Sequence, residues 1–144
     1  RPARPRVLYL MLGETDDWAH DGRYDRVLQS YTQVDRYLQE LWTWVQSQDD
    51  YRDQTTILLT TDHGRGNTPT DWRSHGAKIE GAQYTWLAAI GPDFAPRGEW
   101  GKSPTVYTNQ VAATMAMVLG LGLDFNKTYP AAGKPVAGLL ARDR

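Results

Sequence analysis

The three histidines of the chain are the residues whose types and spacing could do chemistry. His20 follows Asp16 by four residues, His63 directly follows Asp62, and His75 lies in a Ser-His-Gly sequence. Neutral imidazole nitrogens and carboxylate oxygens are ligands that suit zinc, manganese or iron. Because two of the three histidines are paired with an aspartate, the pattern predicts metal binding rather than three unrelated, solvated side chains.

The elements that must position these residues alternate between strands and helices. Continuous apolar runs predict buried strands, and apolar residues at three- and four-residue steps predict amphipathic helices. The predicted strands span residues 7–12, 56–61 and 84–90, and the predicted helices span residues 22–48 and 108–120. The first three elements form a βαβ unit, whose strands are parallel. The sequence therefore predicts an α/β fold with a mostly parallel sheet flanked by helices.

All three histidines are predicted to lie in loops rather than on a helix face. These loops are residues 14–22, the residues directly after the strand at 56–61, and the long loop of residues 65–78. Open parallel sheets bind ligands beyond the carboxyl ends of their strands, so we expect the three loops to meet at one edge of the sheet. Asp17 is an alternative to Asp16 as a ligand, and the spacing alone does not choose between them.

Composition excludes several other classes of function. With 144 residues, 40% of them hydrophobic and 23% charged, the chain is predicted to form a single domain, residues 1–144. Its net charge of −1 gives no nucleic-acid signal, and the lack of cysteine excludes disulfides, a thiolate nucleophile and a zinc finger. No apolar run is long enough to be a membrane segment, and the first residues do not form a signal peptide. Localisation is left open.

The order and spacing of the histidine motifs resemble the alkaline phosphatase superfamily. That superfamily includes phosphodiesterases/nucleotide pyrophosphatases, cofactor-independent phosphoglycerate mutases, phosphopentomutases and sulfatases. The resemblance continues through the strand that ends in Gly-Pro and the helix that ends in Leu-Gly to the closing segment of residues 133–140. The motifs that carry it are Asp16-x-x-x-His20, Thr61-Asp62-His63-Gly64 and Ser74-His75-Gly76.

The resemblance implies two divalent metal ions, commonly zinc or manganese, and a small phosphorylated substrate. Asp16, His20 and His75 would hold one ion, and Asp62 and His63 would hold the other. The family completes the second site with an aspartate and a serine or threonine nucleophile from an N-terminal half that would precede Val7. We therefore expect the chain to be the C-terminal half of a metal-dependent phosphoric ester hydrolase or transferase, inactive by itself.

Three alternatives remain. One is a sulfatase-like hydrolase of sulfated substrates, although that branch uses a single calcium ion, and the Asp16-x-x-x-His20 pair argues against it. Another is a catalytically silent metal-binding module, and the last is an α/β domain with unrelated histidines. Four further residues in the predicted site loops could contact a ring or a phosphate, but each taken singly is better explained as a solvated loop residue. They are Trp18, Arg65, Arg73 and Lys78.

The resemblance also bears on partners. If strands of an N-terminal half normally pair beside those present here, their absence leaves unpaired strand edges and an apolar patch, both of which favour association. We therefore expect self-association, or binding of the missing half of the same protein. The residues expected to be less buried than their type suggests are Met11, Leu12, Ile57, Leu59 and Trp86.

Overall fold

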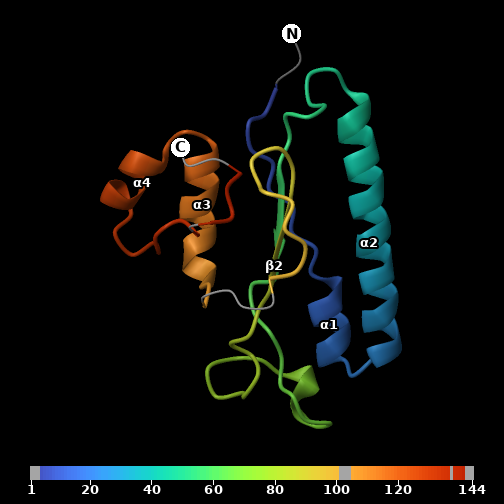
Figure 1. Cartoon of the computed structure of the whole chain (residues 1–144). Coiled ribbons are helices and arrows are strands. Elements are labelled where there is room, and N and C mark those ends of the chain that lie inside the picture. The colour runs from blue at the N-terminus through green and yellow to red at the C-terminus, as the bar shows by residue number, and fades with distance from the viewer. Residues whose placement is uncertain (1–3, 101–104, 137, 142–144) are drawn as a thin grey trace. The chain divides into compact units, whose positions relative to one another are not determined.

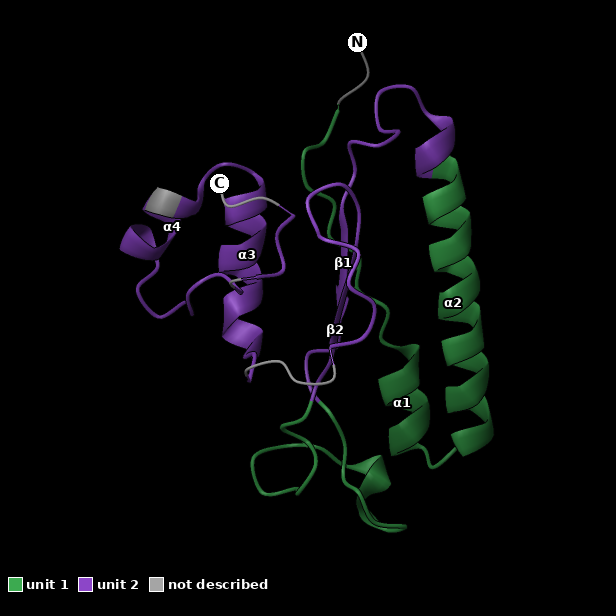
Figure 2. Cartoon of the chain, in the orientation of Figure 1, with its two compact units in different colours: residues 1–44, 64–84 green, residues 45–63, 85–144 purple. Residues whose placement is uncertain are grey.

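The protein folds into two compact units, each built from two stretches of the chain. The computed structural model describes residues 4–100, 105–136 and 138–141. Unit 1 comprises residues 1–44 and 64–84, and unit 2 comprises residues 45–63 and 85–144 (Figure 2). No helix among the described residues has both the length and the apolar character needed to cross a bilayer.

Most of the regular elements along the chain are helices (Figure 1). They are α1 (Glu14–His20), α2 (Tyr24–Ser47), β1 (Ile57–Thr60), the 3₁₀ helix η1 (Asp71–Arg73), β2 (Leu87–Ile90), the 3₁₀ helix η2 (Thr108–Gln110), α3 (Val111–Val118) and α4 (Gly122–Thr128).

Helix α1 replaces the loop that was predicted for residues 14–22. The prediction that no histidine lies on a helix face is therefore wrong for His20, the last residue of α1. Three acidic residues, Glu14, Asp16 and Asp17, fall in the first turn, where the helix dipole favours negative charge, and His20 falls in the last turn. Ala19 is the buried residue of the helix, with 0% exposure. Terminal charges thus stabilise this helix, together with the burial of Ala19, although it has no apolar stripe.

Helix α2 confirms the prediction for residues 22–48. The chain enters it through Gly22, whose φ of 71° is a left-handed conformation that favours glycine. Arg23 then donates hydrogen bonds of 3.0 and 2.8 Å to the two carboxylate oxygens of Asp25 in the first turn. These bonds hold the pKa of Asp25 below its ordinary value and raise the pKa of Arg23. In unit 1, the ring of Tyr24 meets the ring of Trp72 edge-on at 5.4 Å.

The sheet of unit 2 is antiparallel, which corrects the prediction of a mostly parallel sheet. Strands β1 and β2 fall within the predicted ranges 56–61 and 84–90, and they pair with Ile57 opposite Ile90 and Thr60 opposite Leu87. Parallel neighbours need a crossover that is usually helical. The 61–86 connection contains only the single 3₁₀ turn η1, so it provides no helical crossover.

Residues 7–12 do not form the predicted strand. The described part of unit 1 contains no strand with which they could pair, and a backbone ladder requires a partner. All six side chains are apolar or aromatic and are between 48% and 78% exposed. Of the residues expected to be poorly buried, Met11, Leu12 and Trp86 are exposed, while Ile57 and Leu59 are half-buried.

Three of the buried residues of unit 2, Ala113, Thr114 and Ala116, lie on α3. The predicted helix at 108–120 is confirmed as η2 followed by α3. Helix α3 ends at Val118, and Gly120 in the turn after it has a φ of 77°. The N–H of Gly120 donates to the carbonyl of Met117 at 2.9 Å, and that of Leu121 donates to Ala116 at 2.8 Å, which is a Schellman motif. Helix α4 follows directly and was not predicted. The buried residues of this unit are Val45, Phe94, Ala113, Thr114, Ala116 and Val136.

Thr114 ties α3 to the segment that packs on it. Its hydroxyl donates to the carbonyl of Gln110 at 2.8 Å and accepts from the N–H of Val136 at 3.0 Å, and the residue is 1% exposed. In α4, the hydroxyl of Thr128 likewise donates to the carbonyl four residues earlier, that of Asp124, at 3.1 Å. Thr128, however, is exposed. Only Thr114 therefore satisfies a second, buried backbone group.

We expect Thr114→Val to lower the free energy of unfolding by about 1–3 kcal/mol, because the buried N–H of Val136 would lose its acceptor. Thr128→Val is the matched control and should change it by no more than about 0.5 kcal/mol. Urea denaturation of the two variants measures the difference. Equal destabilisation by both substitutions would contradict this role for the Thr114 hydroxyl.

Candidate metal centre

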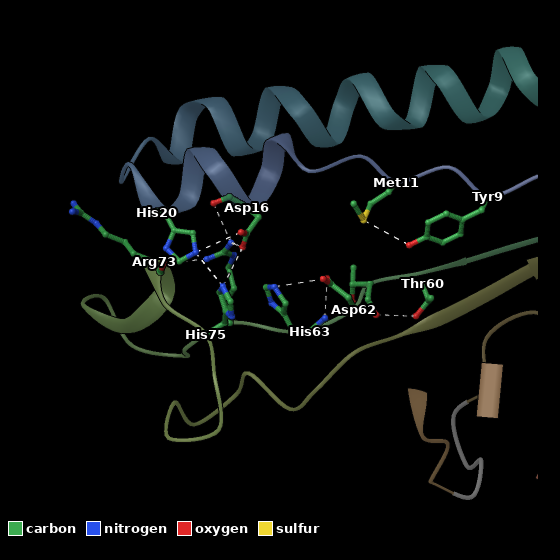
Figure 3. Close-up of polar contacts among 11 residues, drawn as sticks. Tyr9, Met11, Asp16, His20, Thr60, Asp62, His63, Arg73 and His75 are labelled. Atoms are coloured by element: carbon green, nitrogen blue, oxygen red, sulfur yellow. Dashed lines mark hydrogen bonds and ion pairs between the residues drawn. The ribbon is translucent and has the colours of Figure 1, made fainter. Parts of the chain in front are cut away.

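Asp16, His20 and His75 come together in unit 1 (Figure 3). Asp16 and His20 are one helical turn apart on α1, and the carboxylate Oδ2 lies 3.5 Å from Nε2 of His20. Nε2 of His75 lies 3.1 Å from Nε2 of His20 and 3.7 Å from Oδ1 of Asp16. These are the three residues that the resemblance assigned to one metal ion.

Asp16 and Asp17 project in different directions from α1. Side chains three and four positions apart are both neighbours on an α-helix, so spacing from His20 alone does not choose between them. Asp17 is three positions from His20 and about 100° further round the helix than Asp16. Asp16 is the carboxylate that contacts both imidazoles. The structure thus places Asp16 beside both imidazoles, while its choice over Asp17 as a metal ligand stays a prediction.

The loop that carries His75 is folded back on itself by backbone hydrogen bonds within unit 1. The N–H of Gly64 donates to the carbonyl of Ala82 at 2.8 Å, and that of Gly66 donates to Ser74 at 3.1 Å. Both glycines are closely approached by other backbone, because a Cβ at Gly64 would collide with the carbonyl of Tyr84 and one at Gly66 with Asp71. The N–H of Ser74 in turn donates to Asp71 at 2.7 Å, which fixes the residue before His75.

Arg65, at the start of this loop, is bound to the same carboxylate. Its guanidinium forms an ion pair with Oδ1 of Asp16 and donates a hydrogen bond of 3.2 Å to the backbone carbonyl of Asp16. A further bond of 3.1 Å reaches the carbonyl of Arg73. The sequence treated Arg65 as a solvated loop residue, whereas its side chain is only 21% exposed. Its position two residues after His63 carried no signal of this contact.

The donor set of unit 1 fits a tetrahedral transition metal. Two ligand nitrogens on one zinc ion, each at about 2.0–2.1 Å, lie roughly 3.3 Å apart at the tetrahedral angle. The separation between the two Nε2 atoms, 3.1 Å, is close to this value, and the distance from His20 to Asp16, 3.5 Å, is similar. The side chains are 33–48% exposed, so an ion and a substrate could both reach them from solvent.

Asp62 and His63 belong to unit 2 and follow β1 after one intervening residue, at the strand end where they were predicted. Oδ1 of Asp62 accepts a hydrogen bond of 3.0 Å from the backbone N–H of His63 and lies 3.8 Å from Nε2 of the same residue (Figure 3). The Asp62 side chain is 86% exposed, and that of His63 is 27% exposed. Thr60, at the end of the strand, donates to the carbonyl of Trp86 at 2.6 Å.

The chain matches the model of a known protein family. The model of a family described as type I phosphodiesterase / nucleotide pyrophosphatase matches residues 1–128, a range that contains all five predicted metal ligands. Neither the curated proteins nor the solved structures contain a significant match to the chain.

We expect Asp16→Asn, His20→Ala and His75→Ala each to weaken Zn²⁺ or Mn²⁺ binding at least about tenfold, because even partners outside the ligand shell are worth 10–100-fold. Asp17→Asn, with the same charge change one residue away, is the control and should bind as the wild type does. Isothermal titration measures the affinities, and circular dichroism checks that each variant stays folded. Wild-type binding no tighter than that of a triple His→Ala variant would contradict a metal site.

Proposed function

The chain belongs to the type I phosphodiesterase / nucleotide pyrophosphatase family, a member of the alkaline phosphatase superfamily, and from this premise we propose that it forms the metal-binding part of a two-metal active site for phosphoric esters. The family match supports phosphoryl hydrolysis as the general activity. The finer proposal adds two divalent ions, zinc or manganese, and hydrolysis or transfer of a small phosphomonoester or phosphodiester.

The observation that carries this proposal is the convergence of Asp16, His20 and His75, whose ligand atoms lie 3.1–3.7 Å apart. In this proposal these residues hold one ion, and Asp62 with His63 holds the other. Paired divalent ions neutralise the charge of a phosphoryl group and stabilise its attacking and leaving oxygens. The protein's own part is to hold the carboxylates ionised and the imidazoles neutral, with their lone pairs directed at the ion.

The hydroxyl nucleophile is proposed to come from a segment other than the residues described. By resemblance it is a serine or threonine that opens a helix, in an N-terminal half of an alkaline-phosphatase-like fold. The motifs present here supply charge neutralisation and orientation, which bind a phosphoryl group without attacking it. We therefore propose that the chain by itself binds metal and phosphate but turns over little substrate.

The sulfatase-like alternative is less well supported by the donor set. Calcium takes six to eight oxygen ligands. The cluster in unit 1 offers two imidazole nitrogens with a single carboxylate, which suits a borderline transition metal. A catalytically silent module would bind the same ions, so it differs from the proposed function in activity and not in metal binding.

Hydrolysis assays with bis(p-nitrophenyl) phosphate and p-nitrophenyl sulfate test the function. We expect metal-dependent cleavage of the phosphate ester, and none of the sulfate, once the nucleophile-bearing segment is present with this chain. The chain alone should stay within about tenfold of metal ions in buffer, because it lacks the covalent step. Turnover by the chain alone that Asp16→Asn abolishes would contradict the proposed source of the nucleophile. Preference for the sulfate ester would contradict phosphoryl chemistry altogether.

We also propose that residues 7–12 pair with a strand from another segment of the same protein or from a second copy of this chain. Their apolar side chains are 48–78% exposed, and they form no strand. An apolar stretch that is not part of a sheet can offer its backbone N–H and C=O groups as a template for another strand.

Leu10→Lys should therefore reduce self-association, because a charge on this stretch opposes strand pairing. Leu10 is 61% exposed, so the substitution costs little stability. Leu28→Lys, at a residue of α2 that is 49% exposed, is the matched control for a new lysine on exposed apolar surface. Sedimentation at tens of micromolar compares the three proteins. A wild-type chain that is a clean monomer would exclude self-association through this stretch.

A further inference from the structure

We propose that Arg65 couples metal binding to phosphate binding, by sharing the Asp16 carboxylate with the metal ion and by supplying positive charge that a phosphate compensates. The inference rests on the proposed function, because it assumes an ion at Asp16, His20 and His75. It goes further in naming a residue outside the ligand set and the ligand chemistry that this residue recognises.

The contacts of Arg65 fix its guanidinium beside the ligand set. One terminal nitrogen forms the ion pair with Oδ1 of Asp16 and a 3.2 Å bond to the carbonyl of the same residue, and the other bonds the carbonyl of Arg73 at 3.1 Å. The two carbonyl bonds do not depend on the carboxylate, so they would keep the guanidinium in place when Asp16 binds an ion. These three bonds use at most three of the five N–H donors of an arginine.

The carboxylate that pairs with Arg65 also lies close to both imidazoles. Oδ1 of Asp16 lies 3.7 Å from Nε2 of His75, and Oδ2 lies 3.5 Å from Nε2 of His20. A metal ion among these atoms would bind the same negatively charged carboxylate that pairs with Arg65. Two cations on one carboxylate repel each other, and the side chains are partly buried, which weakens solvent screening. Arg65 therefore lowers the intrinsic affinity for the ion.

A count of formal charges shows what restores the balance. Asp16 contributes −1, Arg65 contributes +1 and the two neutral imidazoles contribute nothing, so the four residues sum to zero. A divalent ion raises the sum to +2, and a phosphate dianion returns it to zero. Arg65 keeps its Nε–H and one N–H of Nη1 as donors for a phosphate oxygen, in directions fixed by the planar guanidinium.

Other arginines of unit 1 are engaged differently. The guanidinium of Arg73 lies over the ring of Trp72 at 5.9 Å and fills the space where Gly22 has no side chain. Arg26 lies over the ring of Trp18 at 5.8 Å and donates to the side chain of Gln29 at 3.0 Å. Arg26 is exposed on α2, so Arg26→Gln removes one positive charge from the same unit without touching Asp16.

The experiment measures Mn²⁺ affinity by the electron paramagnetic resonance of the free ion, with and without millimolar inorganic phosphate. In the wild type, phosphate should raise Mn²⁺ affinity by at least about fivefold, the lower end of usual coupling between sites. Arg26→Gln should behave in the same way. Arg65→Gln should bind Mn²⁺ more tightly than the wild type without phosphate, and the phosphate effect should fall below about twofold. Arg65→Lys, which keeps the charge but not the planar guanidinium donors, should retain the weak intrinsic affinity with a smaller phosphate effect.

Two results would overturn the role of Arg65. Weaker Mn²⁺ binding by Arg65→Gln without phosphate would show that Arg65 only positions Asp16. Affinities equal to the wild type under both conditions would show that Arg65 has no part in either equilibrium. A failure of the proposed function looks different, because Mn²⁺ binding would then be unchanged by Asp16→Asn, and the role of Arg65 would fall with it.

Discussion

The contact of the Asp16 carboxylate with the two imidazoles is the interaction on which the rest of the site depends. It exists because residues 14–20 are helical, which turns a spacing of four into a shared face. An isolated helix of seven residues is not stable in water. Helix α1 must therefore be held by its terminal charges, by burial of Ala19 and by the contact of α1 with η1. The chelating geometry is thus a product of tertiary structure.

His75 is positioned by a loop, in contrast to Asp16 and His20, which are positioned by a helix. The glycines at 64 and 66 allow backbone to approach backbone more closely than a Cβ would permit. The hydrogen bonds that this approach makes possible run from one side of the loop to the other and end at Ser74. Loops tied down in this way carry functional side chains with the precision of a regular element. Arg65 lies between the two glycines, and its contacts with Asp16 and Arg73 link the loop to α1.

How much could be predicted from the sequence depends on which interactions are local. The grouping of Asp16, His20 and His75 followed from the resemblance of the motifs to the alkaline phosphatase superfamily, and α2 and α3 followed from apolar periodicity. Helix α1 was missed because dipole interactions leave no apolar pattern to detect. The apolar run at 7–12 showed strand propensity. A strand also needs a second strand to pair with, and the sequence of the run alone does not specify that partner. The direction of β1 against β2 was wrong because it depends on the connection between them.

Arg65 illustrates a further limit, since charge balance is a property of a site and not of a motif. The chain has a net charge of −1, so its overall field gives a phosphate dianion no attraction. Any attraction must then be local, and in our proposal it comes from a bound cation and from the guanidinium of Arg65. A divalent ion with two neutral ligands and one carboxylate has a net charge of +1, and an arginine on that carboxylate raises the sum to +2. The arrangement around Asp16 therefore favours anion binding at the expense of metal affinity, which is the balance that a site for phosphoryl groups requires.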